Sequence, residues 1–83
     1  MASQDTFSLV IASVGETRFD GRALSVTFPG ASGDFTVLAH HQPFVTTLKS
    51  GVIRVRESGE ATKEFIIENG VLEVAGNRAV VLL

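Results

Sequence analysis

The sequence predicts an all-β protein, an antiparallel β-sandwich of roughly ten short strands. Three observations lead to this prediction. Apolar residues alternate with polar ones in many short segments, as in strands that bury one face. Eight glycines mark turns at intervals too short for helices. No window of about eleven residues carries an apolar stripe with the 3.6-residue period of a helix.

The first half of the chain contains four predicted strands, each with apolar residues at alternate positions. They span residues 7–12, 16–20, 23–28 and 35–38. Glycines separate them, and Pro29-Gly30 is predicted to end the third strand.

The second half contains five more predicted strands, at residues 44–48, 52–56, 63–68, 71–74 and 78–83. Pro43 stands at a strand start, because proline lacks the N–H that a central strand needs. Residues 57–60 predict a hairpin loop, and Asn69-Gly70 predicts a tight turn, since both residues tolerate positive φ. We also expect charged side chains to pair across one hairpin, Arg54 or Arg56 with Glu64 or Glu68.

Length and composition limit what kind of protein this chain can be. Its 83 residues predict a single domain, residues 1–83. A net charge of −2 and seven scattered Lys and Arg argue against nucleic-acid binding. The absence of cysteine excludes disulfides and thiolate metal sites. No apolar run approaches the ~20 residues of a membrane helix, and the N-terminus lacks a signal pattern, so we expect a soluble protein without direct membrane insertion.

Two adjacent histidines, His40 and His41, are the first candidates for chemistry. In a strand their side chains would point to opposite faces and could not converge on one ion. Catalytic zinc also uses three convergent protein ligands, and the chain has neither a third histidine nor a cysteine. We therefore expect no metal site. The pair is then either a loop imidazole bonded to the backbone or a contact at a protein–protein interface.

Other catalytic patterns are incomplete. Ser32, Asp34 and His41 could be written as a triad, but no nucleophile elbow accompanies them. The glycine-rich stretch 29–34 lacks the lysine and the following helix of a phosphate-binding loop. No two carboxylates are placed together for acid–base catalysis. We expect no catalytic residue and no cofactor, and a protein that works by presenting a surface.

Several motifs occur in a specific order along nearly the whole chain. They are Phe7-x-Leu9-x-Ile11-x-Ser13, Phe19-x-Gly21, Val26-x-x-Pro29-Gly30, Gly33-Asp34-Phe35, and residues 37–43, 46–55, 69–74 and 79–82. This ordered set resembles the epsilon subunit of F-type ATP synthase, in its N-terminal β-sandwich domain. At 37–43 the family has Leu-Pro-Gly-His-Ala-Pro, with His41 and Pro43 in register. His40 and Gln42 replace small residues of the family pattern.

The resemblance implies a non-catalytic subunit of the central stalk, the rotor of proton-translocating F-type ATP synthase. Such a subunit links the gamma subunit to the c-ring in ATP synthesis coupled to proton transport. It lies peripherally at the cytoplasmic face of the inner, or energy-coupling, membrane. By register, the gamma-subunit contacts would be Ser13, His41, Pro43 and Thr46. The loop facing the c-ring would carry Ser32, Gly33 and Asp34.

The family normally continues into a C-terminal helical hairpin, which regulates ATP hydrolysis and in some members binds ATP. This chain lacks the hairpin and ends at Leu83, at the edge of the predicted sandwich. It is either a naturally short form or a shortened chain, and the absence of a visible tag favours the first. In both cases we expect no helical inhibition and no ATP site here.

A gamma contact requires an exposed apolar patch of several hundred Å² on an outer sheet face. The candidates are Val10, Val52 and Ile66, which are apolar members of otherwise polar strand faces.

The alternative is a free-standing β-sandwich that binds a small ligand or glycan in a concave pocket. The lack of Trp and Tyr argues against a sugar site, which usually stacks on such rings. A small jelly-roll metalloenzyme is disfavoured by the histidine spacing.

Overall fold

The computed structural model describes residues 5–58 and 61–83. These residues form nine strands and no helix, so the all-β prediction is confirmed. The strands are β1 (Phe7–Ser13), β2 (Glu16–Ala23), β3 (Ser25–Gly30), β4 (Gly33–Leu38), β5 (Phe44–Leu48), β6 (Gly51–Arg56), β7 (Thr62–Ile67), β8 (Gly70–Ala75) and β9 (Arg78–Leu82). The predicted hairpin loop at 57–60 lies partly outside the described residues.

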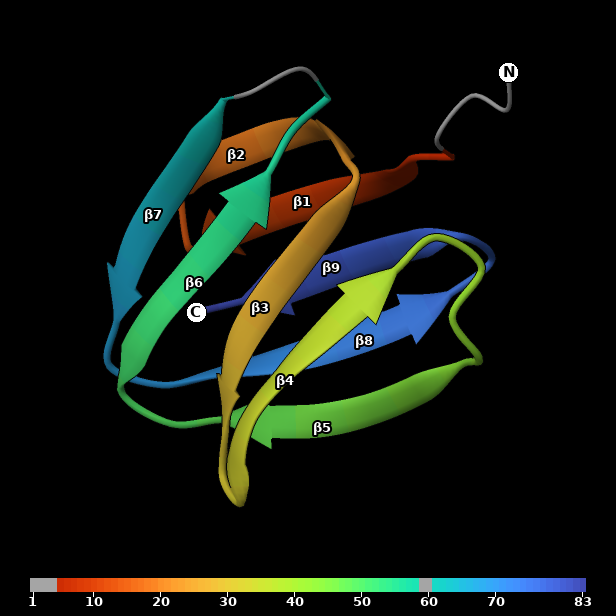
Figure 1. The fold of residues 1–83 in the computed structure, drawn as a ribbon. Coiled ribbons are helices and arrows are strands. Elements are labelled where there is room, and N and C mark those ends of the chain that lie inside the picture. Colours follow the sequence, from red (N-terminus) through yellow and green to blue (C-terminus); the bar gives the residue numbers. More distant parts are fainter. Residues whose placement is uncertain (1–4, 59–60) are drawn as a thin grey trace.

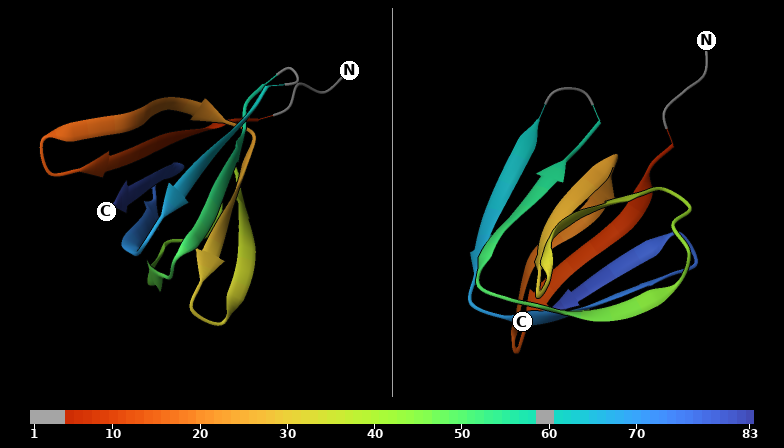
Figure 2. Two further views of the ribbon diagram at one scale, coloured as in Figure 1. Left: turned by 90° about the vertical axis from the view of Figure 1, so that its left-hand side faces the viewer. Right: turned by 60° about the horizontal axis from the view of Figure 1, so that its bottom comes forward.

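The strands form one curled sheet that folds over into two layers (Figures 1 and 2). The front layer in Figure 1 has the order β4-β3-β6-β7, and the back layer has the order β2-β1-β9-β8-β5. The layers are continuous where Gly30 of β3 pairs with Leu48 of β5. Neighbouring strands are antiparallel except for β1 and β9, which run parallel. That parallel pair departs from a purely antiparallel sandwich and places the chain's first and last strands side by side.

The core lies between the two layers and is built from alternate residues of the strands. The largest of these side chains are almost completely shielded from solvent: Phe7, Phe28, Leu9, Ile11, Ile53, Leu72, Val26, Val37, Val55 and Val81. No polar or charged residue of the described part is buried with them. The alternation of apolar and polar residues predicted from the sequence therefore marks the sides of the strands that face the core in both layers.

Strand β3 continues through Pro29 to Gly30, so the prediction that these two residues end it is wrong. Strand β6 pairs with β3 only over Ser25–Thr27, so Pro29 lies outside the paired residues of these two strands, although its ring packs against Gly51 of β6. The Pro29 carbonyl instead accepts a hydrogen bond from the Lys49 N–H at 2.9 Å. Gly30 is required for packing, because a Cβ there would lie 2.8 Å from the Phe35 ring.

The left-handed turn of the second half is Gly76-Asn77, not Asn69-Gly70. Gly76 and Asn77 have φ of +58° and +57° and connect β8 to β9 directly, as in a type I′ hairpin. Neither Asn69 nor Gly70 has positive φ, so the predicted tight turn is wrong. The reason is topological: the connection at Asn69 passes from β7 in one layer to β8 in the other.

Candidate functional site

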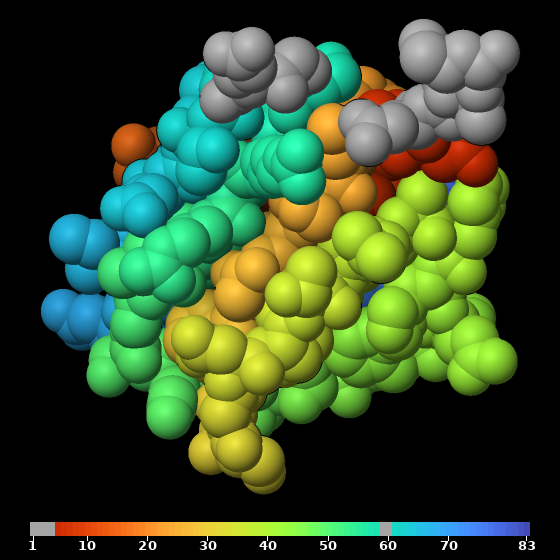
Figure 3. All heavy atoms as spheres, in the orientation of Figure 1, coloured from red at the N-terminus to blue at the C-terminus, as the bar shows by residue number. Residues whose placement is uncertain are grey.

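The predicted c-ring-facing residues lie together at the tip of the β3–β4 hairpin. Ser32, Gly33 and Asp34 are all exposed, and Gly33 has a φ of +131° that favours glycine. The tip projects from the body at the bottom of Figure 1 and in the space-filling view of Figure 3. The structure therefore gathers these three residues on one protruding, polar turn.

The two histidines lie in a loop, residues 39–43, which we call the histidine loop; it connects β4 to β5. His40 has a φ of +64°, so the assumption that the pair occupies a strand is wrong. The His40 ring nitrogen Nε2 lies 3.0 Å from Asp5 Oδ2. The His41 ring packs on Phe44, with ring centroids 4.9 Å apart, and its Nδ1 lies 2.8 Å from the Gln42 carbonyl oxygen. The two imidazoles thus have separate partners.

The four predicted gamma contacts do not form one surface. His41 and Pro43 are exposed in the histidine loop. Thr46 is half-buried on β5, between two exposed neighbours. Ser13 ends β1, next to Ala12, which pairs with the last residue of β9. Because the histidine loop contacts the turn before β9, the length of that strand separates Ser13 from His41.

The catalytic triad written from the sequence cannot form. Ser32 and Asp34 lie at the tip of the β3–β4 hairpin, whereas His41 follows the opposite end of β4. A strand of six residues spans about 17 Å between its first and last Cα atoms. Within the described residues, no three His, Asp or Glu side chains gather where they could hold a metal ion.

The predicted apolar patch of Val10, Val52 and Ile66 is not continuous. Val52 and Ile66 pair across β6 and β7 and belong to the front layer. Val10 belongs to β1, in the back layer. Ile66 is 78% exposed, while Val10 and Val52 are half-buried. The three residues are therefore not all buried, but they lie on the outer sides of different layers.

A larger group of apolar side chains lies on the outer side of the back layer, where Glu73 stands between Val45 and Val80. We call it the outer apolar face, and its residues are Val10, Ala12, Val45, Val71, Val80 and Leu82. The pairing of β1, β9 and β8 places Val80 beside Val10, and Leu82 beside both Ala12 and Val71. Val45, Leu82 and Val71 are 65%, 59% and 42% exposed. These side chains point away from the core because their strand neighbours point into it.

The outer apolar face could have been suspected from the sequence, because two of its strands contain consecutive apolar residues. Strands at residues 71–74 and 79–82 are apolar at consecutive positions, apart from Glu73. A strand with one side in water should alternate, whereas a nearly continuous apolar run indicates a strand covered on both sides. The second side of β8 and β9 is uncovered in the isolated chain, which points to a partner.

The outer side of the front layer is the side seen in Figure 3, and it mixes polar side chains with Leu38, Val52 and Ile66. The hydroxyls of Thr27 and Thr36 are 3.0 Å apart across β3 and β4. Arg54 donates to Glu64 at 3.0 Å, which confirms the predicted cross-strand pair. Both side chains are more than half exposed, so the pair contributes little to stability. Leu38 is separated from the other apolar residues of this side by polar ones, since Thr36 and Arg54 lie between Leu38 and Ile66 along the layer.

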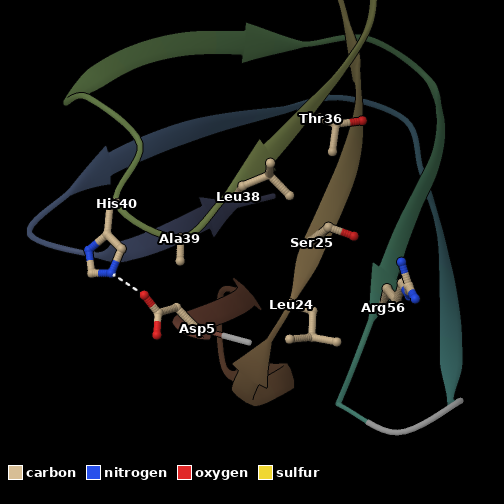
Figure 4. Close-up of a pocket in the computed structure, with 8 residues that line it drawn as sticks. All are labelled: Asp5, Leu24, Ser25, Thr36, Leu38, Ala39, His40 and Arg56. Carbon is tan, nitrogen blue, oxygen red and sulfur yellow. Dashed lines mark hydrogen bonds and ion pairs between the residues drawn. The ribbon is translucent and has the colours of Figure 1, made fainter. Parts of the chain in front are cut away.

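A hollow on the described surface has a volume of about 410 Å³. Its lining is shown in Figure 4: Asp5, Leu24, Ser25, Thr36, Leu38, Ala39, His40 and Arg56. Asp5 and His40 are engaged with each other and do not converge on the hollow with the other polar groups. The arrangement therefore does not favour the alternative of a pocket for a small ligand or glycan.

An all-strand, two-layered body with exposed apolar residues on one face is typical of a β-sandwich domain that associates with other proteins. No helix that could cross a membrane occurs in the described residues. The chain belongs to the ATP synthase delta/epsilon chain family, because the family model for the β-sandwich domain matches residues 6–83. The ATP synthase epsilon chain of Chlorobium limicola is 40% identical over 83 residues, covering 99% of this chain and 94% of that relative.

Solved structures share the fold. A chain of the Euglena gracilis mitochondrial ATP synthase, in an OSCP/F1/c-ring structure, aligns with a TM-score of 0.87 at 20% identity. The alignment covers 93% of this chain and 49% of that one. A chain of the Tetrahymena thermophila central stalk and c-ring aligns with a TM-score of 0.77 at 14% identity, covering 98% of this chain and 65% of that one.

Proposed function

We propose that this chain acts in the central stalk of proton-translocating F-type ATP synthase, where it links the gamma subunit to the c-ring. ATP synthesis coupled to proton transport would then depend on it without any catalysis of its own. We place it peripherally at the cytoplasmic face of the energy-coupling membrane. The observation that carries the proposal is the outer apolar face, on a chain of the epsilon family.

The outer apolar face is suited to the gamma subunit. Its strands β8 and β9 lie in the middle of the back layer, so the surface is backed by the packed core and changes shape little on binding. Its side chains lie in two adjacent rows across the strands, in which Glu73 stands between Val80 and Val45 and Thr47 stands beside Val71, so the apolar part is centred on β1 and β9 with a polar edge toward β5. The exposed histidine loop follows directly into β5, which carries Val45 of this face, so His41 and Pro43 would lie at its rim.

The tip of the β3–β4 hairpin is suited to a polar partner surface such as the loops of the c-ring. It exposes Ser32 and Asp34 and lies at the other end of β4 from the histidine loop. The two proposed contacts are thus separated along the body of the domain. A close-packed two-layer body between them would transmit torque with little deformation.

The proposal is tested by titrating the purified chain with the gamma subunit of the same complex in a calorimeter. We expect a defined complex, and replacement of His41 by glutamate should weaken it about tenfold, because a carboxylate at the rim would lose hydration next to apolar surface. Ser58→Glu, an exposed change on the front layer's side, serves as the control and should bind normally. Absence of binding by the unaltered chain would rule out the proposed function.

Reversal of the charge at the hairpin tip should affect the other partner. Asp34→Lys should weaken retention of the chain on a gamma–c-ring complex about fivefold in a pull-down, since the tip would face polar loops with the wrong charge. Affinity for isolated gamma should stay unchanged. The control is Glu68→Lys, the same reversal at an exposed site between β7 and β8. Equal losses in both variants would show that net charge, not the tip, is responsible.

A further inference from the structure

Asn77, the second residue of the β8–β9 turn, connects three segments that are distant in sequence. Its Oδ1 accepts a hydrogen bond from the His40 N–H at 2.8 Å, and its Nδ2 donates to the Thr6 carbonyl at 3.0 Å. Its own carbonyl accepts from the Ser8 N–H at 3.2 Å. The orientation of the carboxamide follows from these partners, because a backbone N–H can only donate and a carbonyl can only accept.

The turn itself sets the direction of the Asn77 side chain. Asn77 and Gly76 are both left-handed, a conformation that asparagine adopts more readily than most residues and glycine adopts freely. A glycine at position 77 can therefore keep the turn and the backbone bond to Ser8 while removing both side-chain bonds. This separates the role of the side chain from the role of the turn.

The histidine loop needs such a support at His40. This residue has a Cβ and a φ of +64°, a combination that costs conformational free energy unless the surroundings hold it. The side chains of His40 and Asp5 are each about two-thirds exposed, so solvent weakens the contact between them. The bond from the His40 N–H to Asn77 acts directly on the strained backbone and is the better candidate for fixing the loop.

Removal of the Asn77 side chain should release the histidine loop more than the start of β1. Thr6 has a second support, because Arg22 donates from Nη2 to its carbonyl at 2.9 Å and from Nε to its hydroxyl at 3.1 Å. The Ser8 N–H bond uses the backbone of residue 77 and is independent of its side chain. The His40 N–H, in contrast, depends on the side-chain oxygen.

We propose that Asn77 is the positioning residue of the histidine loop: its carboxamide holds the His40 backbone so that His41 and Pro43 are ordered before a partner arrives. This inference rests on the proposed function insofar as the partner is the gamma subunit. A loop that is already ordered loses less conformational entropy on binding and so binds more tightly. Asn77 itself need not touch that partner.

The experiment compares Asn77→Gly, Asn77→Asp and the control Asn69→Gly in the full chain. In the free chain, amide hydrogen exchange at His40 should accelerate about tenfold in Asn77→Gly, because its N–H loses its acceptor. Gamma affinity should fall about fivefold, measured without urea, where circular dichroism shows the variant to be folded. Asn77→Asp keeps an acceptor oxygen and should retain most of the His40 protection and of the affinity. Asn69→Gly, a change at the exposed asparagine between β7 and β8, should alter neither.

The outcomes distinguish this inference from the proposed function. If the unaltered chain does not bind gamma, the proposed function fails, and the exchange rate of the His40 amide still decides whether Asn77 holds the loop. If the chain binds gamma but Asn77→Gly leaves both the exchange rate and the affinity unchanged, the positioning role is wrong. Equal losses in Asn77→Asp and Asn77→Gly would also overturn it, because the acceptor to His40 would then not be the cause.

Discussion

Replacement of Val71 by aspartate should weaken binding to the gamma subunit by about 100-fold or more. Val71 lies on the outer apolar face beside Leu82 and is 42% exposed in the isolated chain. In the proposed complex it would be fully covered, so a carboxylate there would have to lose its hydration without a partner. The fold should survive, because the side chain points away from the core. Calorimetry with gamma measures the affinity, and urea unfolding verifies the fold.

A set of matched variants separates apolar burial from charge. Val71→Lys should be as damaging as Val71→Asp, because either charge is costly in a covered apolar surface. Ile66 provides the control: it is also apolar and 78% exposed, but it lies on the front layer. Ile66→Asp and Ile66→Lys should bind normally. If only one sign of charge at Val71 is harmful, gamma is attracted electrostatically and the apolar face is not the main contact.

Truncation of Phe28 to alanine should have the largest effect on stability, lowering the free energy of unfolding by about 3–5 kcal/mol. The Phe28 ring is completely buried in the middle of the core and lies 5.6 Å from the Phe35 ring, centroid to centroid. Its removal leaves a cavity that the close-packed layers cannot fill. A domain of this size has a total stability of about 4–12 kcal/mol, so the loss removes a large fraction of it.

The measurement is urea unfolding followed by circular dichroism. Leu38→Ala is the comparison, since Leu38 is also a large apolar residue but is 57% exposed. That variant should lose less than about 1 kcal/mol. A Phe28→Ala variant as stable as Leu38→Ala would mean that the two layers can collapse around the missing ring, contrary to a rigid core.

Local pattern identified the strands well, because side-chain alternation is a property of each strand by itself. Strand β6, for example, alternates Ile53 and Val55 inward with Arg54 outward, as its sequence predicts. Errors arose where the neighbour of a residue belongs to another part of the chain. Pro29 remains in β3 because it pairs with Asp34 of β4, while the pairing with β6 has ended at Thr27. Asn69 is not in a hairpin because its two strands belong to different layers.

For the same reason, the sequence predicted the residues at the hairpin tip but not those of the outer apolar face. Ser32, Gly33 and Asp34 are consecutive, so their common location at one tip followed from the sequence. Val45, Val71 and Leu82 come from three strands and become one surface only through strand order. These residues lie together because β8 pairs with both β5 and β9. That pairing joins distant segments and cannot be read from the residues of any one strand.

The amino-acid sequence by itself predicted that the chain is all-β, where the strands lie, and to which family its ordered motifs point. Only the tertiary structure decided which apolar residues remain outside the core, that Ser13 is far from His41, and that Asn77 supports the histidine loop. The physical reason is that the alternation of side chains along a strand fixes which side of that strand is apolar. The order of strands in the sheet fixes which strands lie next to one another and form a common surface. Docking depends on the second of these, because a partner contacts neighbouring strands together.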